Sequence, residues 1–264
     1  MPELPEVETL VRSLHSIAGT HIVEAEILDD RLALAGDELI GASIVGVTRR
    51  GKYIVIGLNG RGDLIVHLRM SGRLRLDRSE CETPYTRMIL RLDSGQSVYF
   101  VNPRRLGTVM LCPNGFEANL GVEPTGEAFT IERLADLAGM CRAPVKQLLL
   151  NQRKIAGIGN IYAAEALWRA QIDPRRPGDS LGTGEIEALH VGITSVLTDA
   201  IAQLGTTIGT SVSDYRLSAE EGGSFQNHLA VYGRKDEPCE RCGTRIERII
   251  QAGRSTWFCP ACQQ

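Results

Sequence analysis

The chain has 264 residues, of which 43% are hydrophobic and 23% charged, and its formal net charge is −3. This length allows two domains with a core each, and the net charge argues against a simple basic DNA-coating protein. No apolar run approaches the ~20 residues that a membrane span requires, and the acidic start does not resemble a secretory signal. We therefore expect a cytoplasmic protein without a membrane anchor.

The basic residues are unevenly distributed along the chain. Residues 1–40 hold nine acidic and two basic residues, which leaves 27 basic against 23 acidic residues in the remainder. Many basic residues form short clusters, at 49–52, 69–78, 104–105, 153–154 and 241–254. Clusters that share one surface would form a groove for a polyanion. The alternative is that they are separate solvated faces.

The first predicted element is a helix that begins near Pro5. Proline suits the first helical position, and acidic residues such as Glu6 and Glu8 suit the first turn. Apolar residues at positions 7, 10, 11, 14 and 17 form one stripe, which ends before Gly19. Taken alone, this stretch needs no role beyond starting a helix.

Pro2 suggests a chemical role for the same stretch. Removal of Met1 leaves a chain that begins with a secondary amine, and an α-amino group titrates about two pH units below a lysine. The free base can attack a sugar C1′ and form an iminium, which activates the neighbouring carbon for elimination. Glu3 and Glu6 would supply carboxylates for proton transfer and for balancing the cation. A chain that retains Met1 lacks this amine.

The residues that follow favour a β-rich domain. Seven short segments are rich in β-branched residues and often alternate apolar with polar positions, and glycine-containing turns separate them. They lie at 22–28, 39–49, 52–58, 63–69, 86–92, 97–101 and 107–112. We predict a β-sandwich or barrel-like domain over residues 1–113, followed by a proline- and glycine-rich linker over 114–129.

The pattern then becomes helical. Apolar residues recur every three to four positions in four segments, at 131–138, 144–151, 160–170 and 184–204. A stretch rich in Gly, Ser and Thr at 206–228 has little periodicity, and long loops of this kind tend to be functional. We predict a helical domain over residues 130–228 and a small cysteine module over 229–264.

The C-terminal module carries four regularly spaced cysteines. Cys239 and Cys242 form one CxxC pair, and Cys259 and Cys262 form a second pair after sixteen intervening residues. Two such pairs typically supply four thiolates to one structural Zn²⁺ ion, and a disulfide pair is the weaker alternative in a cytoplasmic chain. A turn at 253–255 favours a β-hairpin zinc finger. The other cysteines are expected to be reduced and without a role: Cys81, Cys112 and Cys141.

The stretch IAGIGNIY at 155–162 has the features of a phosphate-binding turn. Two glycines precede a predicted helix, whose N-terminal amides can hold a phosphate, and Asn160 adds a side-chain donor. A tight turn between two helices explains the same residues equally well.

Two other stretches carry residues suited to entering a DNA duplex. Met70, within HLRMSG at 67–72, is flexible and apolar enough to fill the gap left by an extruded base. Arg104 and Leu106, within NPRRLG at 102–107, offer a guanidinium and an apolar wedge on one loop.

Together these stretches resemble the bacterial formamidopyrimidine-DNA glycosylase family and, more distantly, its endonuclease VIII branch. The resemblance covers residues 2–263, and the ordered set of motifs is specific although each motif alone could be chance. The motifs are PELPEVET at 2–9, GKY at 51–53, HLRMSG at 67–72, NPRRLG at 102–107, AGIGNIYAAEAL at 156–167, VYGR at 231–234 and GRSTWFCPAC at 253–262.

The resemblance implies an α+β fold with an N-terminal β-sandwich preceded by a helix, a helical helix–two-turns–helix domain, and a β-hairpin zinc finger. It implies a bifunctional DNA glycosylase and lyase that excises oxidised purines, chiefly 8-oxoguanine and formamidopyrimidines, from duplex DNA. Strand cleavage would follow by β,δ-elimination through a Schiff base on the N-terminal proline. We expect one structural Zn²⁺ ion, damaged double-stranded DNA as the partner, no small-molecule cofactor, and a monomer associated with the bacterial nucleoid.

Motif positions also imply roles for single residues. Pro2 would be the nucleophile and Glu3 the general acid for the sugar. Glu6 would support the site, and Lys52 would bind phosphate and donate a proton. On residue type alone, a lone lysine or histidine such as Lys52 or His67 would be a surface residue or a core residue with its hydrogen bonds satisfied.

The resemblance assigns the DNA contacts to two groups. The first holds the phosphates that flank the lesion and consists of His67, Asn160 and Arg254. The second fills the space left by the flipped nucleotide and consists of Met70, Arg104 and Leu106, with Arg104 facing the orphaned cytosine and Arg105 beside it. A lid over residues 210–224 would close over the extruded base.

The chain departs from the family pattern at two positions in the second group's loop. Asn102 and Leu106 stand where the family usually has Asp and Phe, and leucine cannot stack on a base. Two alternatives therefore stay open: a glycosylase for oxidised pyrimidines, as in the endonuclease VIII branch, and a catalytically silent protein that binds damaged DNA. The motif PELPEVET and the paired arginines favour the purine branch, and the presence of Pro2, Glu3 and Lys52 favours an enzyme.

Overall fold

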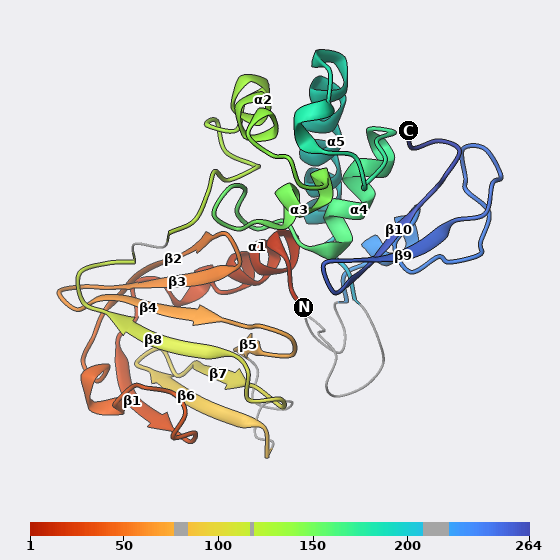
Figure 1. The fold of residues 1–264 in the computed structure, drawn as a ribbon. Helices are drawn as coiled ribbons and strands as arrows, with labels where there is room; N and C mark the ends of the chain where they lie inside the picture. Colours follow the sequence, from red (N-terminus) through yellow and green to blue (C-terminus); the bar gives the residue numbers. More distant parts are fainter. Residues whose placement is uncertain (77–83, 117–118, 208–221) are drawn as a thin grey trace. The chain divides into compact units, whose positions relative to one another are not determined.

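The computed structural model describes residues 1–76, 84–116, 119–207 and 222–264. The chain folds as two compact units (Figure 1). The first unit takes in Met1–Ala118 and Leu204–Gly223, and the second takes in Asn119–Gln203 and Ser224–Gln264. No helix among the described residues is long and apolar enough to cross a membrane.

The first unit contains a helix and two four-stranded antiparallel sheets (Figure 1). Its elements are α1 (Leu4–Ser13), β1 (Ile22–Ile27), β2 (Ile44–Arg50), β3 (Tyr53–Leu58), β4 (Gly62–His67), β5 (Arg73–Arg75), β6 (Thr86–Leu92), β7 (Ser97–Val101) and β8 (Thr108–Cys112). One sheet has the order β2-β3-β4-β8 and the other the order β1-β6-β7-β5. The predicted β-sandwich with an N-terminal helix is confirmed.

A single apolar core joins these elements. Alternate residues of β3 are buried, among them Ile54 and Ile56, and they belong to the same apolar core as Leu90 and Phe100 from the other sheet. The apolar stripe of α1 packs on β2 and β3 and closes one side of this core. Each such buried side chain contributes about 1.5–3 kcal/mol, which fixes the position of α1 and hence of the residues that precede it.

The strand predictions differ from the structure in two places. The segment predicted as a strand over 39–49 begins its strand only at Ile44, because a 3-10 turn at Gly36–Glu38 and Gly41 in the left-handed region (φ +80°) occupy the residues before it. The short strand β5 was not predicted, since three residues are too few to show an alternating pattern.

The second unit is helical and ends in a β-hairpin (Figure 1). Its elements are α2 (Ile131–Gly139), α3 (Val145–Leu150), α4 (Asn160–Arg169), α5 (Thr183–Ala202), β9 (Glu247–Gln251) and β10 (Arg254–Phe258). Thr130 begins α2 by accepting the Arg133 backbone N–H at 3.1 Å, as helix-capping residues do. The predicted helical domain and β-hairpin are confirmed.

The hairpin turns earlier than its glycine pattern suggested. Gln251 pairs with Arg254, so that Ala252 and Gly253 form the turn. Both have positive φ, 47° and 74°, as the tightest type I′ hairpin turns require. Arg254 therefore opens strand β10 and does not lie within the turn.

Candidate active site

The start of α1 buries two carboxylates next to Pro2 in the chain. Glu3 is 3% exposed and Glu6 is 2% exposed, and Pro2 itself is buried. The Glu3 backbone N–H donates to Glu6 Oε2 at 2.8 Å, which holds the Glu6 side chain back toward the start of the helix. Carboxylates are rarely buried unless they are paired or used. Glu3 and Glu6 are therefore candidates for a functional role as well as a capping box at the start of the helix.

Glu6 is also held by a residue from the far end of the unit. Thr206 donates to Glu6 Oε1 from its backbone N–H at 2.8 Å and from its hydroxyl at 2.9 Å. Gly205 precedes it with φ +79°, and a Cβ there would lie 2.7 Å from Glu6 Oε1. Only glycine allows the chain to approach the carboxylate this closely. The expected lid at 210–224 falls largely outside the described residues.

Lys52 lies in a turn that is tied to α1. Gly51 and Lys52 connect β2 to β3, and Gly51 takes the positive φ (58°) that such a hairpin turn requires. Arg49 donates to the Gly51 carbonyl at 3.1 Å and to Glu8 of α1 at 3.0 Å. This link fixes the turn relative to the helix that carries Glu3 and Glu6. Lys52 itself is buried.

His67 is a neutral hydrogen-bond donor. Its Nδ1 accepts the Arg69 backbone N–H at 3.0 Å, so the ring proton lies on Nε2. Burial, together with the charges of Arg69 and Lys52, lowers the pKa of His67 from 6.5 to about 4. The Tyr53 ring packs edge-on against the imidazole, with 4.6 Å between the ring centroids. Any contact of His67 with a phosphate is therefore that of an uncharged donor.

Met70 lies on a tight turn after β4. Arg69 adopts a left-handed conformation (φ 54°), and the Gly72 backbone N–H closes the turn on Leu68 O at 2.9 Å. A Cβ at Gly72 would lie 2.5 Å from the same oxygen, so the turn requires glycine. Met70 is 43% exposed, which is unusual for a methionine in an ordered turn.

The 102–107 loop has two exposed side chains, one buried side chain and one that is partly exposed and bound to a buried carboxylate. Arg104 and Leu106 are exposed, whereas Asn102 is buried and donates to the Gly107 carbonyl at 3.2 Å. Arg105 points to Asp29, with its Nε 2.8 Å from Oδ2. The side-chain hydrogen bonding of Arg105 to Asp29 lowers the pKa of Asp29 to about 2. Within the protein, the Arg105 guanidinium is bound by the carboxylates of Asp29 and Asp30. The expected contact of Arg105 with DNA stays a prediction.

In the second unit, Asn160 and the segment of Arg254 lie together. Asn160 is the first residue of α4, and its Nδ2 donates to the carbonyl of Ser255 at 3.0 Å. Lys146, which is buried, donates to the same carbonyl at 2.9 Å and to Thr256 Oγ1 at 2.6 Å. Arg254 is exposed beside these contacts. Sequence patterns did not indicate Lys146, because a single lysine in a short apolar helix gives no signal of burial.

The glycine turn before α4 is built differently from a simple phosphate-binding loop. Gln152 donates from Nε2 to the Ile158 carbonyl at 2.7 Å and accepts the Gly157 backbone N–H at 2.9 Å. Gly157 has φ +89°, so glycine serves the turn itself. The Gly157 amide is thus used within the protein and is not available to a phosphate.

Glu165 is a second buried residue that sequence patterns did not indicate. Its carboxylate accepts the backbone N–H groups of Ala230, Val231 and Tyr232 at 2.8–3.0 Å. Burial raises the pKa of Glu165, and the three amide hydrogen bonds act against this. The interaction holds the chain that enters the cysteine module against α4.

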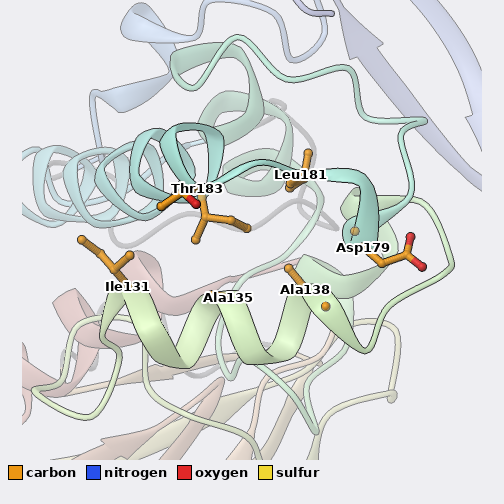
Figure 2. Close-up of a pocket in the computed structure, with 9 residues that line it drawn as sticks. Ile131, Ala135, Ala138, Asp179, Leu181 and Thr183 are labelled. Carbon is orange, nitrogen blue, oxygen red and sulfur yellow. The ribbon is translucent and has the colours of Figure 1, made fainter.

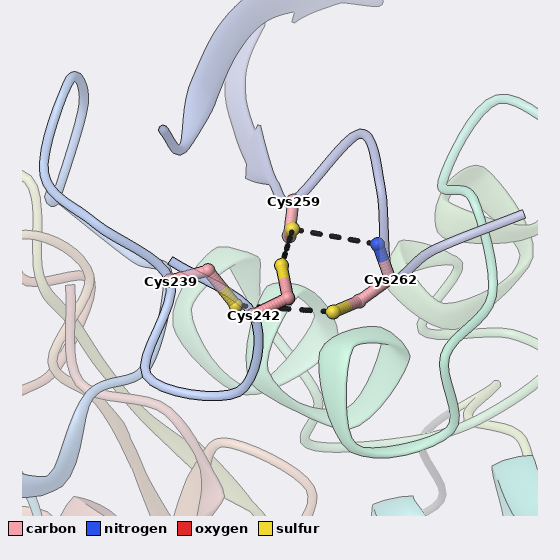
Figure 3. A group of neighbouring side chains, drawn as sticks. All are labelled: Cys239, Cys242, Cys259 and Cys262. Atoms are coloured by element: carbon pink, nitrogen blue, oxygen red, sulfur yellow. Dashed lines mark hydrogen bonds between the residues drawn. The ribbon is translucent and has the colours of Figure 1, made fainter. Parts of the chain in front are cut away.

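The four regularly spaced cysteines form one cluster (Figure 3). Their sulfur atoms all lie within 4.8 Å of one another, with 4.0 Å between Cys239 and Cys262 and 3.5 Å between Cys242 and Cys259. Ligands in a tetrahedron with Zn–S bonds of about 2.3 Å are separated by roughly 3.8 Å. The cluster therefore fits one zinc ion with four thiolate ligands, which leaves no position for water and makes the site structural.

A small cavity in the second unit takes no part in these arrangements (Figure 2). Its volume is about 150 Å³, and it lies between α2 and the segment 178–186. Its lining is mostly apolar, with Ile131, Ala135 and Leu181 among its residues. None of the residues predicted to act in the site lines it.

Comparisons with known proteins agree with a zinc-containing DNA repair glycosylase. The formamidopyrimidine-DNA glycosylase N-terminal domain matches residues 1–109, the H2TH domain of the same enzymes matches 120–212, and the zinc finger found in FPG and IleRS matches 236–264. Formamidopyrimidine-DNA glycosylases of Roseiflexus sp. and Paracoccus denitrificans are 42% and 43% identical, with 100% of each chain covered. The chain belongs to the formamidopyrimidine-DNA glycosylase family.

Solved structures of relatives share the whole fold. MutM (FPG) from Thermus thermophilus is 40% identical with a TM-score of 0.88, over 99% of this chain and 98% of that one. A Lactococcus lactis FPG mutant in complex with Fapy-dG containing DNA is 35% identical with a TM-score of 0.89, over 100% of both chains. The protein is thus a DNA glycosylase with a structural zinc site, and lyase activity at abasic sites is expected of its family.

Proposed function

We propose that this enzyme excises oxidised purines, 8-oxoguanine and formamidopyrimidines, from duplex DNA and then cleaves the strand at the resulting site. The observation that carries the proposal is the start of α1, where Pro2 precedes two buried carboxylates, one of which is held from both sides. Relatives of the same fold bind DNA that contains Fapy-dG and carbocyclic 8-oxo-G, which supports this choice of substrate.

The reaction begins when removal of Met1 exposes the Pro2 amine. The amine nitrogen attacks C1′ of the extruded nucleotide, the bond from C1′ to the base breaks, and the proton lost by the amine leaves with the base. Glu3 protonates the sugar ring oxygen, so that the ring opens and an iminium forms between Pro2 and C1′. Loss of a C2′ proton then expels the 3′ phosphate, and a second elimination expels the 5′ phosphate.

Other residues of the first unit bind and balance charge during these steps. Glu6 offsets the positive iminium, and its three hydrogen bonds hold the carboxylate in place. Lys52 binds a phosphate and donates a proton to a leaving group. His67 donates its Nε2 proton to a phosphate without adding charge.

Residues of both units hold the opened duplex. Met70, Arg104 and Leu106 occupy the space of the extruded nucleotide, and their exposure on two turns supports this role. In the second unit, Asn160 and Arg254 hold phosphates. Unstacking one nucleotide costs a few kcal/mol, which such contacts offset.

We also propose a division into a catalytic domain over 1–113, a linker over 114–129, a helical domain over 130–228 and a zinc finger over 229–264. The regions matched by the family, 1–109, 120–212 and 236–264, support three domains in this order. Because bacterial DNA lies in the cytoplasm, we place the enzyme there, on the nucleoid, as a monomer.

Borohydride trapping tests the proposal. Protein without Met1 is incubated with duplexes that carry 8-oxoguanine, formamidopyrimidine, thymine glycol or an abasic site, and borohydride reduces any iminium to a stable cross-link. We expect cross-links with the two purine lesions and the abasic site. Trapping on thymine glycol alone would assign the enzyme to oxidised pyrimidines, and binding without any cross-link would leave only a protein that binds damaged DNA.

A further inference from the structure

Asp29 is a buried carboxylate that the proposed reaction does not use. Its side chain is only 2% exposed, a degree of burial that is rare for an acid without a charged partner. The partner is Arg105, which donates from Nε to Asp29 Oδ2 at 2.8 Å and from a terminal nitrogen to Oδ1. Two parallel hydrogen bonds of this kind fix the plane of the guanidinium as well as its position.

The order of strands explains why Asp29 and Arg105 meet, although they are 76 residues apart in the sequence. β1 and β7 both pair antiparallel with β6, so they run in the same direction. Asp29 follows β1 and the 102–107 loop follows β7, so both leave the sheet at the same edge. Arg87, on β6 between them, lies 3.6 Å from Asp29 and donates to the Asn102 carbonyl at 3.3 Å.

The 102–107 loop has an uncommon backbone conformation at Arg105, the residue that binds Asp29. Arg105 has φ +52°, in the left-handed region that residues other than glycine rarely adopt. Its neighbours Arg104 and Leu106 are exposed, the latter by 52%. Because Arg105 turns inward to Asp29, the residues on either side of it face outward.

We propose that Asp29 is a positioning residue, which through Arg105 holds the 102–107 loop in the shape that presents Arg104 and Leu106 to the partner base of the lesion. The inference rests on the proposed function, in which these two side chains enter the duplex. Loss of the Asp29 carboxylate releases the loop, and the enzyme then distinguishes partner bases less well. The amine chemistry at Pro2 is not touched by the change.

Asp30 provides a matched control on the same guanidinium. Its carboxylate also accepts a hydrogen bond from Arg105, at 2.9 Å, but its side chain is 92% exposed. Water screens such a pair, so it contributes little. Asp29→Asn and Asp30→Asn each remove one negative charge beside Arg105, and only the first removes a buried, forked hydrogen-bond partner.

The experiment measures single-turnover excision of 8-oxoguanine opposite each of the four bases, together with nicking of a single-stranded abasic oligonucleotide, which has no partner base. We expect Asp29→Asn to reduce the ratio between the best and the worst partner base about ten-fold, as the loss of one charge-assisted contact does. Its nicking of the single strand should match that of the wild type. Asp30→Asn should keep the wild-type ratio.

Arg105→Gln removes the same bridge from its exposed side and should reduce the ratio similarly. The double variant Asp29→Asn/Arg105→Gln should be no worse than either single variant, because both act through one interaction. Should Asp29→Asn fail to fold, a wild-type ratio in Arg105→Gln overturns the inference.

Three other results would overturn the inference that Asp29 is a positioning residue. A wild-type ratio in folded Asp29→Asn overturns the inference and leaves the proposed function intact. A parallel loss of single-strand nicking shows that Asp29 is merely structural, which also overturns it. Equal excision opposite all four bases by the wild type overturns the role of Arg104 in the proposed function, and the inference with it.

Discussion

Glu6 and Thr206 are 200 residues apart in the sequence, yet two hydrogen bonds join them, at 2.8 Å from the Thr206 backbone N–H and at 2.9 Å from its hydroxyl. Both residues are buried. The bonds aim one oxygen of Glu6 at Thr206, while the other accepts the Glu3 backbone N–H. The Glu6 carboxylate is thus held in one orientation through both of its oxygens.

Thr206→Val tests the hydroxyl bond. Valine has nearly the shape of threonine, so the change removes one hydrogen bond to a charged group, worth about 1.5–3 kcal/mol. We expect base excision to fall roughly ten-fold or more. Thr206→Ser keeps the hydroxyl and should stay close to the wild type in single-turnover excision. Equal loss in the valine and serine variants would show that the hydroxyl is not the cause.

Gly205→Ala tests the close approach of the chain to Glu6. The new methyl group would lie 2.7 Å from Glu6 Oε1, so we expect the carboxylate to be displaced and excision to be lost. Gly95→Ala is the matched control, because Gly95 also has a positive φ (84°) and no atom lies within 4 Å of its Cβ position. Gly95→Ala should lose about 1–2 kcal/mol of stability in thermal unfolding, the cost of the left-handed conformation, and Gly205→Ala should lose more because of the overlap with Glu6. Only Gly205→Ala should lose activity, and an active Gly205→Ala would contradict the tight fit.

Glu3→Gln separates base excision from strand cleavage. The amide cannot protonate the sugar, so excision of 8-oxoguanine should fall by roughly the hundred-fold or more that general acids contribute. A preformed abasic site needs no such step, and nicking there should largely survive. Glu24→Gln, at an exposed acid on β1, should leave both activities unchanged. Equal loss of both activities in Glu3→Gln would contradict the proposed division of roles.

The protonation of His67 predicts a pH dependence. The pKa of His67 is lowered from 6.5 to about 4, chiefly by burial, so the folded protein keeps the ring neutral while the unfolded chain protonates it. Stability should therefore be complete above pH 6.5 and decline as the pH falls from 6.5 to about 4. NMR of the imidazole should show no titration above pH 5 or so. His67→Gln should remove this part of the decline, and an unchanged profile would refute the assignment.

Loss of one zinc ligand should disable DNA binding. Cys262→Ser removes one thiolate of four, and a structural zinc site supplies much of the folding energy of so small a module. We expect less than one bound zinc per chain and loss of duplex binding in a titration. Cys141→Ser, at a cysteine outside the cluster, should keep both. Duplex binding that survives zinc loss would show that the finger is dispensable.

Much of the fold could be predicted because its signals are local. The helices α2 to α5 were found close to their observed bounds, since apolar spacing and flanking glycine or proline repeat within each segment. The three-residue strand β5 was missed because it is too short to carry a pattern. Bends were harder to place, and the hairpin turn lies at Ala252 and Gly253, before the position that the glycine pattern indicated.

The sequence by itself determined what chemistry the chain carries. The spacing of Cys239, Cys242, Cys259 and Cys262 indicated a zinc site, and Pro2 with Glu3 predicted an amine nucleophile beside an acid, because the residues of each set are close along the chain. Only the tertiary structure decided which groups are buried, charged and fixed. The contacts of Glu6 with Thr206 and of Asp29 with Arg105 join segments that are distant in the sequence. Local patterns could not predict these contacts, because they depend on how the folded chain brings distant segments together.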